Sequence, residues 1–247
     1  MKAKVLAFIM FCLLLSGCGT GEETTVQNNK LYDGLTGEET YHEAVSYFNK
    51  NVSYYKSEMT DDMSDYLSEY YQSDDGVETV TKALYFDGET SVFNYNIICK
   101  SDFHSLFMNE DGVYEYELTN DYANQQLQMY NDVTSQDGFE LMEVKREDSD
   151  SGIVLTLKVK YVENEELEET SYYTNEVIIN EDGFICQETV IYYSDDQFLE
   201  ALSEGVTSVC SDFNKKSLSD LDAEIELMKS CQGLSDDEVK NKIGFMQ

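Results

Sequence analysis

Apolar and polar residues alternate along most of the middle of the chain. The clearest case is residues 153–162, where the apolar side chains fall at every second position. The residues on this apolar face are Ile153, Leu155, Leu157, Val159 and Tyr161. A period of two is typical of a β-strand with one buried face. Strand-like stretches also predict strands over residues 51–63, 66–72, 79–86, 91–100, 104–108, 113–118, 139–146, 169–180 and 184–193. Turns such as Asp87-Gly88 would join neighbouring strands as antiparallel hairpins.

Helical patterns flank these strands. Residues 40–43 read as a capping box that opens a short helix with Ala44 and Phe48 among its apolar positions. A second short helix is expected over residues 122–131. Three more are expected to begin at Ser194, Ser219 and Ser235. Because the sheet has one apolar face that must be covered, we predict an α+β fold in which helices cover an antiparallel sheet, with extra C-terminal helices.

The first residues form a separate pattern. Residues 1–4 carry two lysines and no acid, and residues 5–15 are an unbroken apolar run. As a helix this run would span about 16 Å, roughly half the hydrocarbon thickness of a bilayer. The small residues Ser16 and Gly17 follow, and then Cys18. A positive start, a short apolar core and small residues before a cleavage point are typical of a secretory signal.

The segment Leu15-Ser16-Gly17-Cys18 resembles the lipobox of bacterial lipoprotein precursors, which reads Leu, a small residue, Gly or Ala, and Cys. The resemblance implies transfer of a diacylglyceryl group to the Cys18 thiol and cleavage before Cys18. Acyl chains such as palmitate would then hold the mature chain on the extracytoplasmic face of the cell membrane. The alternative is an ordinary secretory signal with a cysteine at this position by chance.

These patterns divide the chain into four segments. We expect a signal peptide over residues 1–17 and a lipidated, flexible tether over residues 18–38. An antiparallel sheet-and-helix domain is expected over residues 39–205, with a C-terminal helical extension packed on it over residues 206–247. The polar run after Cys18 suits a tether because it offers little apolar surface to bury.

Charge narrows the choice of partners. The chain has 50 acidic and 16 basic residues, a net charge of −34. Nucleic acid binding is excluded because it needs a basic surface. Anionic lipid headgroups would also repel the folded part, which should stand off the membrane. The chain has no proline, so we expect Gly, Asn and Asp to form its turns. Its 19 tyrosines favour strands.

Four cysteines remain once Cys12 and Cys18 are set aside. They are Cys99, Cys186, Cys210 and Cys231. Outside the cytoplasm, four cysteines can form two disulfides in any of three connectivities. We favour Cys99–Cys186 between strands and Cys210–Cys231 between C-terminal helices, with reduced, buried thiols as the alternative. No Cys-x-x-Cys pair occurs among them, which disfavours zinc binding and thioredoxin-like chemistry.

Catalytic patterns are scarce. Neither His42 nor His104 has a partner at metal-binding spacing, and both are expected to be structural or exposed. Hydrolases with a Ser or Cys nucleophile need a His base, and neither their motifs nor a phosphate-binding or dinucleotide-binding loop occurs. Asp148 and Asp150 begin a calcium-like pattern, but Gly152 comes one place too early for an EF-hand. We expect a protein that is not an enzyme and holds no cofactor or metal.

The order of elements over residues 40–195 resembles the LolA-like lipoprotein-carrier superfamily. The segments that carry the resemblance are LFMNEDGVYEYELTND, FELMEVKRED, IVLTLKVKYV and EVIINEDGFICQETVIYYSDD. The resemblance implies a curved, half-barrel-like sheet with helices on its concave face. It also implies a cavity for a lipid or other apolar ligand, for which the apolar face of residues 153–162 is the candidate lining. The alternative is that this face is simply packed core.

Two other functions stay open beside apolar ligand binding. One is a non-enzymatic cell-surface module that binds an envelope protein. The other is a transporter-associated binding protein, which normally has two α/β lobes with parallel strands, whereas hairpins are expected here. In each case the membrane contact is the lipid anchor.

Overall fold

The computed structural model describes residues 30–61, 64–74, 76–87, 90–121, 129–130, 132–149, 152–164 and 169–244. These residues divide into two compact units, each built from two stretches of chain. Unit 1 takes its described residues from 30–51 and 130–211, and unit 2 from 52–129 and 212–247. The range predicted to form one domain, residues 39–205, contributes to both units.

The N-terminal predictions lie outside the described residues. These are the signal peptide over residues 1–17, the lipidated Cys18 and the first part of the tether. Most of the helix expected over residues 122–131 also lies outside them. Within the expected tether, η1 (Lys30–Tyr32) is a 3-10 turn and Tyr32 is buried, so the ordered chain already includes residues before position 39.

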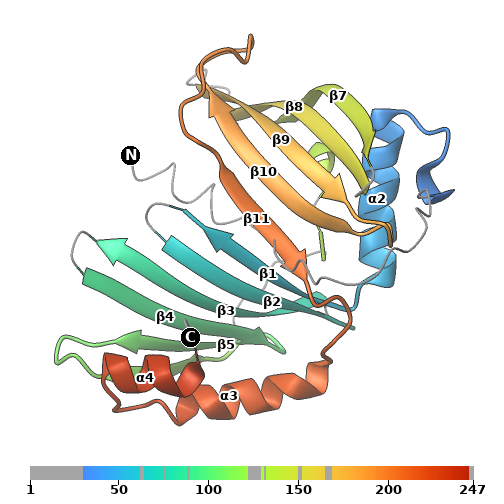
Figure 1. The fold of residues 1–247 in the computed structure, drawn as a ribbon. Helices are drawn as coiled ribbons and strands as arrows, with labels where there is room; N and C mark the ends of the chain where they lie inside the picture. Colours follow the sequence, from blue (N-terminus) through green and yellow to red (C-terminus); the bar gives the residue numbers. More distant parts are fainter. Residues whose placement is uncertain are drawn as a thin grey trace. The chain divides into compact units, whose positions relative to one another are not determined.

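Unit 1, in its described residues, is a five-stranded antiparallel sheet with one α-helix, α2 (Gly37–Asn51) (Figure 1). A 3-10 turn, η2 (Val133–Ser135), precedes the first of its strands. The strands are β7 (Phe139–Ser149), β8 (Gly152–Asn164), β9 (Glu169–Ile179), β10 (Ile185–Tyr193) and β11 (Val206–Ser211). Their order is β11-β10-β9-β8-β7, and α2 contacts β7 and β10.

The inward face of this sheet follows from the strand register. Val177 of β9 lies opposite both Leu155 of β8 and Glu188 of β10. Directly opposed residues project to the same face of a sheet, so one face runs across these three strands. The residues that α2 buries are Thr40, Tyr41, Ala44, Val45 and Phe48. Burial of this helix stripe and of the inward face of the sheet forms the core of unit 1.

The start of α2 is fixed by a capping box, but not the predicted one. The Thr36 backbone N–H donates to Glu39 Oε2 at 2.9 Å, and the Glu39 N–H donates to Thr36 Oγ1 at 3.3 Å. The predicted box over residues 40–43 is therefore wrong by one helical turn. Thr40 instead donates to the Thr36 carbonyl at 2.6 Å and accepts a bond from Arg146 Nη1 of β7 at 2.8 Å. This bond ties the first turn of the helix to the sheet.

Unit 2, in its described residues, is a six-stranded antiparallel sheet with two short helices (Figure 1). The strands are β1 (Tyr54–Thr60), β2 (Ser64–Ser73), β3 (Gly76–Asp87), β4 (Thr90–Cys99), β5 (Asp102–Met108) and β6 (Tyr114–Thr119). Sequential hairpins give the order β6-β5-β4-β3-β2-β1. A 3-10 turn, η3 (Leu218–Asp220), leads into α3 (Leu221–Lys229), and α4 (Asp236–Ile243) follows.

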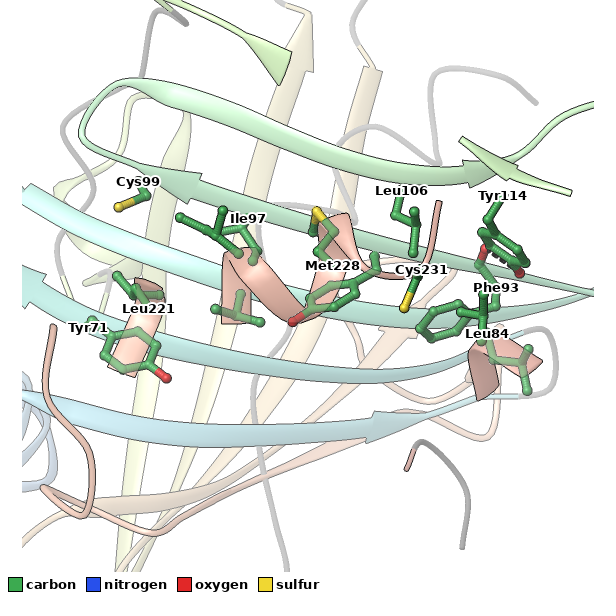
Figure 2. Packing of buried hydrophobic residues seen from close by; sticks show 14 of the residues in the cluster. Tyr71, Leu84, Phe93, Ile97, Cys99, Leu106, Tyr114, Leu221, Met228 and Cys231 are labelled. Atoms are coloured by element: carbon green, nitrogen blue, oxygen red, sulfur yellow. Dashed lines mark hydrogen bonds between the residues drawn. The ribbon is translucent and has the colours of Figure 1, made fainter. Parts of the chain in front are cut away.

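The core of unit 2 lies between its sheet and its helices. Leu221 and Met228 of α3 project among strand side chains, including Ile97 of β4 (Figure 2). The Tyr114 hydroxyl of β6 donates to Asp236 Oδ1 at the start of α4, at 2.7 Å. The helices thus close the apolar face of a sheet whose strands precede them by more than a hundred residues.

The C-terminal predictions are partly confirmed. The Ser235 capping box forms with Glu238 and opens α4, and α3 begins two residues after the expected start at Ser219. The helix expected from Ser194 is wrong, because residues 194–205 form a loop. Strand β11 comes directly after this loop, inside the segment expected to be helical.

The predicted α+β class is confirmed in its broad form. The paired strands are antiparallel, both sheets are open, and helices cover part of the sheet surface. The sheet dominates, since the described residues contain eleven strands and three α-helices.

Truncation of the helix–sheet contact in unit 2 should be costly. Met228 is 0% exposed, so Met228→Ala is expected to lower the free energy of unfolding by about 2–5 kcal/mol, because it removes buried methylenes and leaves a cavity. Met142 is 44% exposed, and Met142→Ala should cost less than about 1 kcal/mol. Urea denaturation followed by circular dichroism measures both. Equal losses in the two variants would contradict this packing.

Candidate functional site

The residues predicted to line an apolar cavity are deeply buried. Ile153, Leu155, Leu157 and Val159 are each at most 3% exposed. The fifth, Tyr161, is half-buried, and its ring stacks on Phe139 with 4.3 Å between ring centroids. These side chains share the inward face of unit 1 with Val177 and other core residues. In the described residues this face is occupied by protein side chains.

The predicted sulfur sites are distributed over both units. Cys18 lies outside the described residues. Cys99 of β4 and Cys231 after α3 belong to unit 2, whereas Cys186 of β10 and Cys210 of β11 belong to unit 1. All four are free thiols in the structure. Neither of the two favoured disulfides is present, and each would join cysteines of different units.

Unit 1 buries a carboxyl group that the sequence analysis missed. Glu188 of β10 is 6% exposed and lies on the inward face. Asn175 Nδ2 donates to Glu188 Oε1 at 2.9 Å, and the Tyr130 hydroxyl donates to the same oxygen. Burial raises the pKa of Glu188 to about 8, because a charged carboxylate loses its hydration there. Glu188 is therefore mostly protonated at neutral pH.

The pattern of β10 contains a signal for this buried acid. Glu188, Val190 and Tyr192 occupy alternate positions along β10. Because alternate residues of a strand project to the same face, this pattern already places Glu188 on the inward face. Near it, Asn175 is 0% exposed, and its Oδ1 has no hydrogen-bond partner in the described structure. The cluster is thus a polar group inside an apolar core, screened from solvent.

Unit 2 handles its buried charges differently, by pairing them. Lys216 Nζ lies 2.8 Å from both carboxylate oxygens of Glu69, and the Tyr71 hydroxyl donates to Glu69 at 2.5 Å. Lys82 Nζ of β3 lies 3.3 Å from Glu224 Oε2 of α3. These two ion pairs join the sheet to the C-terminal segment that covers it.

The protonation of Glu224 follows from its neighbours. Burial alone would raise the pKa of this carboxyl group, but the Lys82 ammonium, the hydroxyl of Tyr95 and Lys216 together lower it below its usual value. Glu224 is therefore ionised at neutral pH, and its charge is matched by the lysines. Because both partners of each pair are already engaged, the network serves to hold the helix rather than to bind an ion.

Two hollows open on unit 2. The larger, of about 400 Å³, lies beside β1, β2 and β3, and its lining includes Lys56, Glu58, Asp65 and Lys82. Lys56 forms an ion pair with Glu58, and Lys82 pairs with Glu224. The volume suits a small molecule, but ligand pockets are usually mostly apolar, and the cations here are already paired.

The smaller hollow, of about 280 Å³, has Cys99, His104 and Lys229 in its lining. His104 Nδ1 lies 2.8 Å from the Tyr116 hydroxyl, and burial lowers the pKa of this imidazole. Burial also raises the pKa of the Cys99 thiol, so the pair is not poised for nucleophilic chemistry. The other histidine, His42, contacts Asp132 at 2.8 Å and lies in unit 1.

The loop between β10 and β11, residues 194–205, is held in one conformation by several contacts. The Ser194 N–H donates to the Glu200 carbonyl at 3.1 Å, and the Leu202 N–H donates to the Tyr192 carbonyl at 2.8 Å. The Phe198 ring lies against two tyrosines and a lysine of the sheet. These are Tyr172, Tyr193 and Lys158, with ring centroids 6.2 and 5.4 Å away and the ammonium 5.0 Å away. Phe198 thus anchors the loop to its own sheet.

The anchored loop presents two leucines to solvent. Leu199 is 86% exposed and Leu202 is 62% exposed, the largest exposed fractions among the large hydrophobic side chains of the described residues. The loop contains four acids and no basic residue. The acids are Asp195, Asp196, Glu200 and Glu204. Exposed apolar side chains that are surrounded by polar residues can mark a contact surface, so this loop is the candidate. The sequence did single out Phe198, Leu199 and Leu202, but as a helical stripe.

Comparison with known proteins adds no relative, since no protein-family model and no curated protein matches this chain. Within the described ranges, no three His, Cys, Asp or Glu side chains are grouped to hold a metal ion. None of the helices seen between residues 30 and 244 has both the length and the apolar character of a membrane span.

The buried carboxyl group predicts a specific pH dependence of stability. The folded protein keeps the Glu188 proton up to about pH 8, whereas the unfolded chain releases it near its usual pKa of about 4.3. The free energy of unfolding should therefore fall as the pH rises from about 4.5 to 8, by at most about 1.4 kcal/mol per pH unit from this group. Glu188→Gln should remove this component. Urea titrations across that range measure it.

Glu176 of β9 is exposed, so Glu176→Gln is the matched control and should keep the wild-type dependence. A wild-type slope that survives in Glu188→Gln would show that another group carries it.

Proposed function

We propose that this chain is a membrane-anchored extracytoplasmic lipoprotein whose folded part is a non-enzymatic interaction module. We further propose that the loop over residues 194–205 docks a basic partner protein of the cell envelope. The observation that carries this proposal is the exposure of Leu199 and Leu202 on an ordered, acidic loop.

The anchor rests on the lipobox-like segment before Cys18. Two acyl chains on one thiol would bury many methylenes at about 0.8 kcal/mol each, which makes release from the bilayer slow. The described fold begins at Lys30, which leaves 11 residues between Cys18 and the first described residue. A stretch of that length would keep the folded part close to the membrane while the net charge of −34 opposes contact with anionic headgroups.

Pre-organisation supports docking by the loop. Binding partners pay less conformational entropy when the contact residues are already fixed, and the loop is fixed by backbone hydrogen bonds and by Phe198. Burial of an exposed leucine contributes about 1.5–3 kcal/mol, so the two leucines can supply a useful share of a micromolar affinity.

Charge selects the partner class. The acids beside the leucines favour a surface with basic residues around an apolar pocket, and they oppose a second copy of this acidic chain. The same acids disfavour insertion into an anionic membrane. A basic protein is therefore the partner that best matches this loop.

The hypothesis that the chain carries a lipid in the apolar cavity of a half-barrel sheet stays a prediction. It would require space beside Leu155 and Leu157, and both are 0% exposed in the structure. We favour the interaction module for this reason. The hypothesis that the chain is a transporter-associated binding protein also stays a prediction.

Substitution of the lipidated cysteine tests the anchor. Cys18→Ser should abolish incorporation of labelled palmitate and release the chain from the membrane fraction, because serine offers no thiol for alkylation. Cys12→Ser, in the same segment, is the control and should leave both unchanged. Labelling followed by fractionation measures both outcomes. A Cys18→Ser variant that keeps its label and stays with the membrane would contradict the proposal.

A synthetic amphipathic Lys–Leu helix, as a basic apolar probe, tests the loop. At low salt it should bind the wild-type folded part, and Leu199→Ser with Leu202→Ser should weaken binding at least tenfold, as fluorescence anisotropy would measure. Leu118→Ser with Met142→Ser removes two other exposed side chains as a control and should leave affinity within about twofold.

Equal losses in the two double variants would contradict docking by this loop. Leucine-dependent binding to phosphatidylglycerol vesicles would also overturn the choice of a protein partner.

A further inference from the structure

The register of β10 and β11 brings two cysteines together. Gln187 lies opposite Val209, and Glu188 lies opposite Ser208. Continued by one residue, the same antiparallel register places Cys186 opposite Cys210. Both residues belong to these strands, and both lie in unit 1.

The geometry of such a pair suits a bond between the sulfur atoms. Directly opposed residues of antiparallel strands have Cα atoms about 4.5–5.5 Å apart and side chains on the same face. Disulfides need Cα separations of about 4.4–6.8 Å, a range that includes the usual spacing of such a pair. The register of β10 against β9 shifts between Ile185 and Gln187, at Cys186, and such a bulge bends the strand and increases its local twist.

We propose that Cys186 and Cys210 form a disulfide in the exported protein. The oxidant is a disulfide compound of the glutathione class or a protein disulfide. The Cys186 thiolate attacks one of its sulfur atoms and releases one thiolate. The Cys210 thiolate then attacks the Cys186 sulfur of this mixed disulfide and releases the second. Two cysteine thiols are oxidised, the external disulfide is reduced to two thiols, and two protons pass from the cysteines to the released thiolates.

Burial determines when the exchange takes place. Cys186 is half-buried and Cys210 is 3% exposed. Burial raises the pKa of Cys186 to about 11 and raises that of Cys210 well above its usual value. Thiolates are therefore scarce in the folded chain, and the exchange is fast only before the hairpin is packed. Once formed, the bond is protected from reductants by the same burial.

The bond would fix the base of the docking loop. Residues 194–205 lie between the two cysteines in the sequence, so the disulfide closes a covalent ring that contains Leu199 and Leu202. The consequence for docking rests on the proposed function, whereas the bond itself depends only on the strand pairing and on an oxidising environment.

Refolding of the purified folded part in reduced and oxidised glutathione tests the bond independently of export. Free thiols are alkylated, and the protein is digested without reduction. Mass spectrometry should find the peptides of Cys186 and Cys210 linked, with Cys99 and Cys231 alkylated. Alkylation of both Cys186 and Cys210, or a different dominant pairing, would overturn the proposal.

Thermal unfolding provides a second readout. The oxidised protein should melt about 5–10 °C above its reduced form, because a ring of about 25 residues restricts the unfolded chain. Cys186→Ala should abolish this difference, and Cys99→Ala should keep it. Each variant is compared with its own reduced form, so any loss of stability caused by the substitution itself cancels. A difference that persists in Cys186→Ala would contradict the bond.

Discussion

Burial of one apolar sheet face is the constraint on which the rest of this structure depends. Strands of period two place half of their side chains on each face, and the apolar half must be removed from water. In unit 1, α2 supplies the cover from the N-terminal side of the chain. In unit 2, α3 and α4 supply it from the C-terminal side. Because each cover is distant in sequence from the strands it packs on, both units are assembled from two stretches of chain.

The two cores treat buried polar groups in different ways. Unit 2 matches Glu69 and Glu224 with lysines, so full charges stay inside at the cost of their hydration. Unit 1 keeps Glu188 protonated beside Asn175 and Tyr130, so no full charge is buried at neutral pH. In both cores these buried polar groups bind mainly to one another. The contact surface that we propose comes instead from apolar groups left outside, on the loop of residues 194–205.

The strands could be predicted because alternation and strand-forming residues are local signals, and ten of the eleven strands overlap a predicted stretch. The β11 strand was missed because it is only six residues long and lies between two stretches that were predicted to be helical, although its Val and Thr residues favour a strand. The helix expected at Ser194 fails for a tertiary reason, since Phe198 packs on Tyr193 rather than on its own helix neighbours. Division into two units was beyond the sequence because it depends on long-range pairing. The candidate loop was visible as apolar residues, but only the structure shows which of them are exposed.

Docking as proposed requires this loop to be ordered before it meets a partner. Amide hydrogen exchange of the free protein tests this most directly. The amides of Ser194 and Leu202 are expected to exchange at least tenfold more slowly than in an unstructured peptide of the same sequence, because each donates to a backbone carbonyl. Exchange at the rate of the peptide at both amides would show that the leucines are not held in place, and it would contradict docking by a pre-ordered loop.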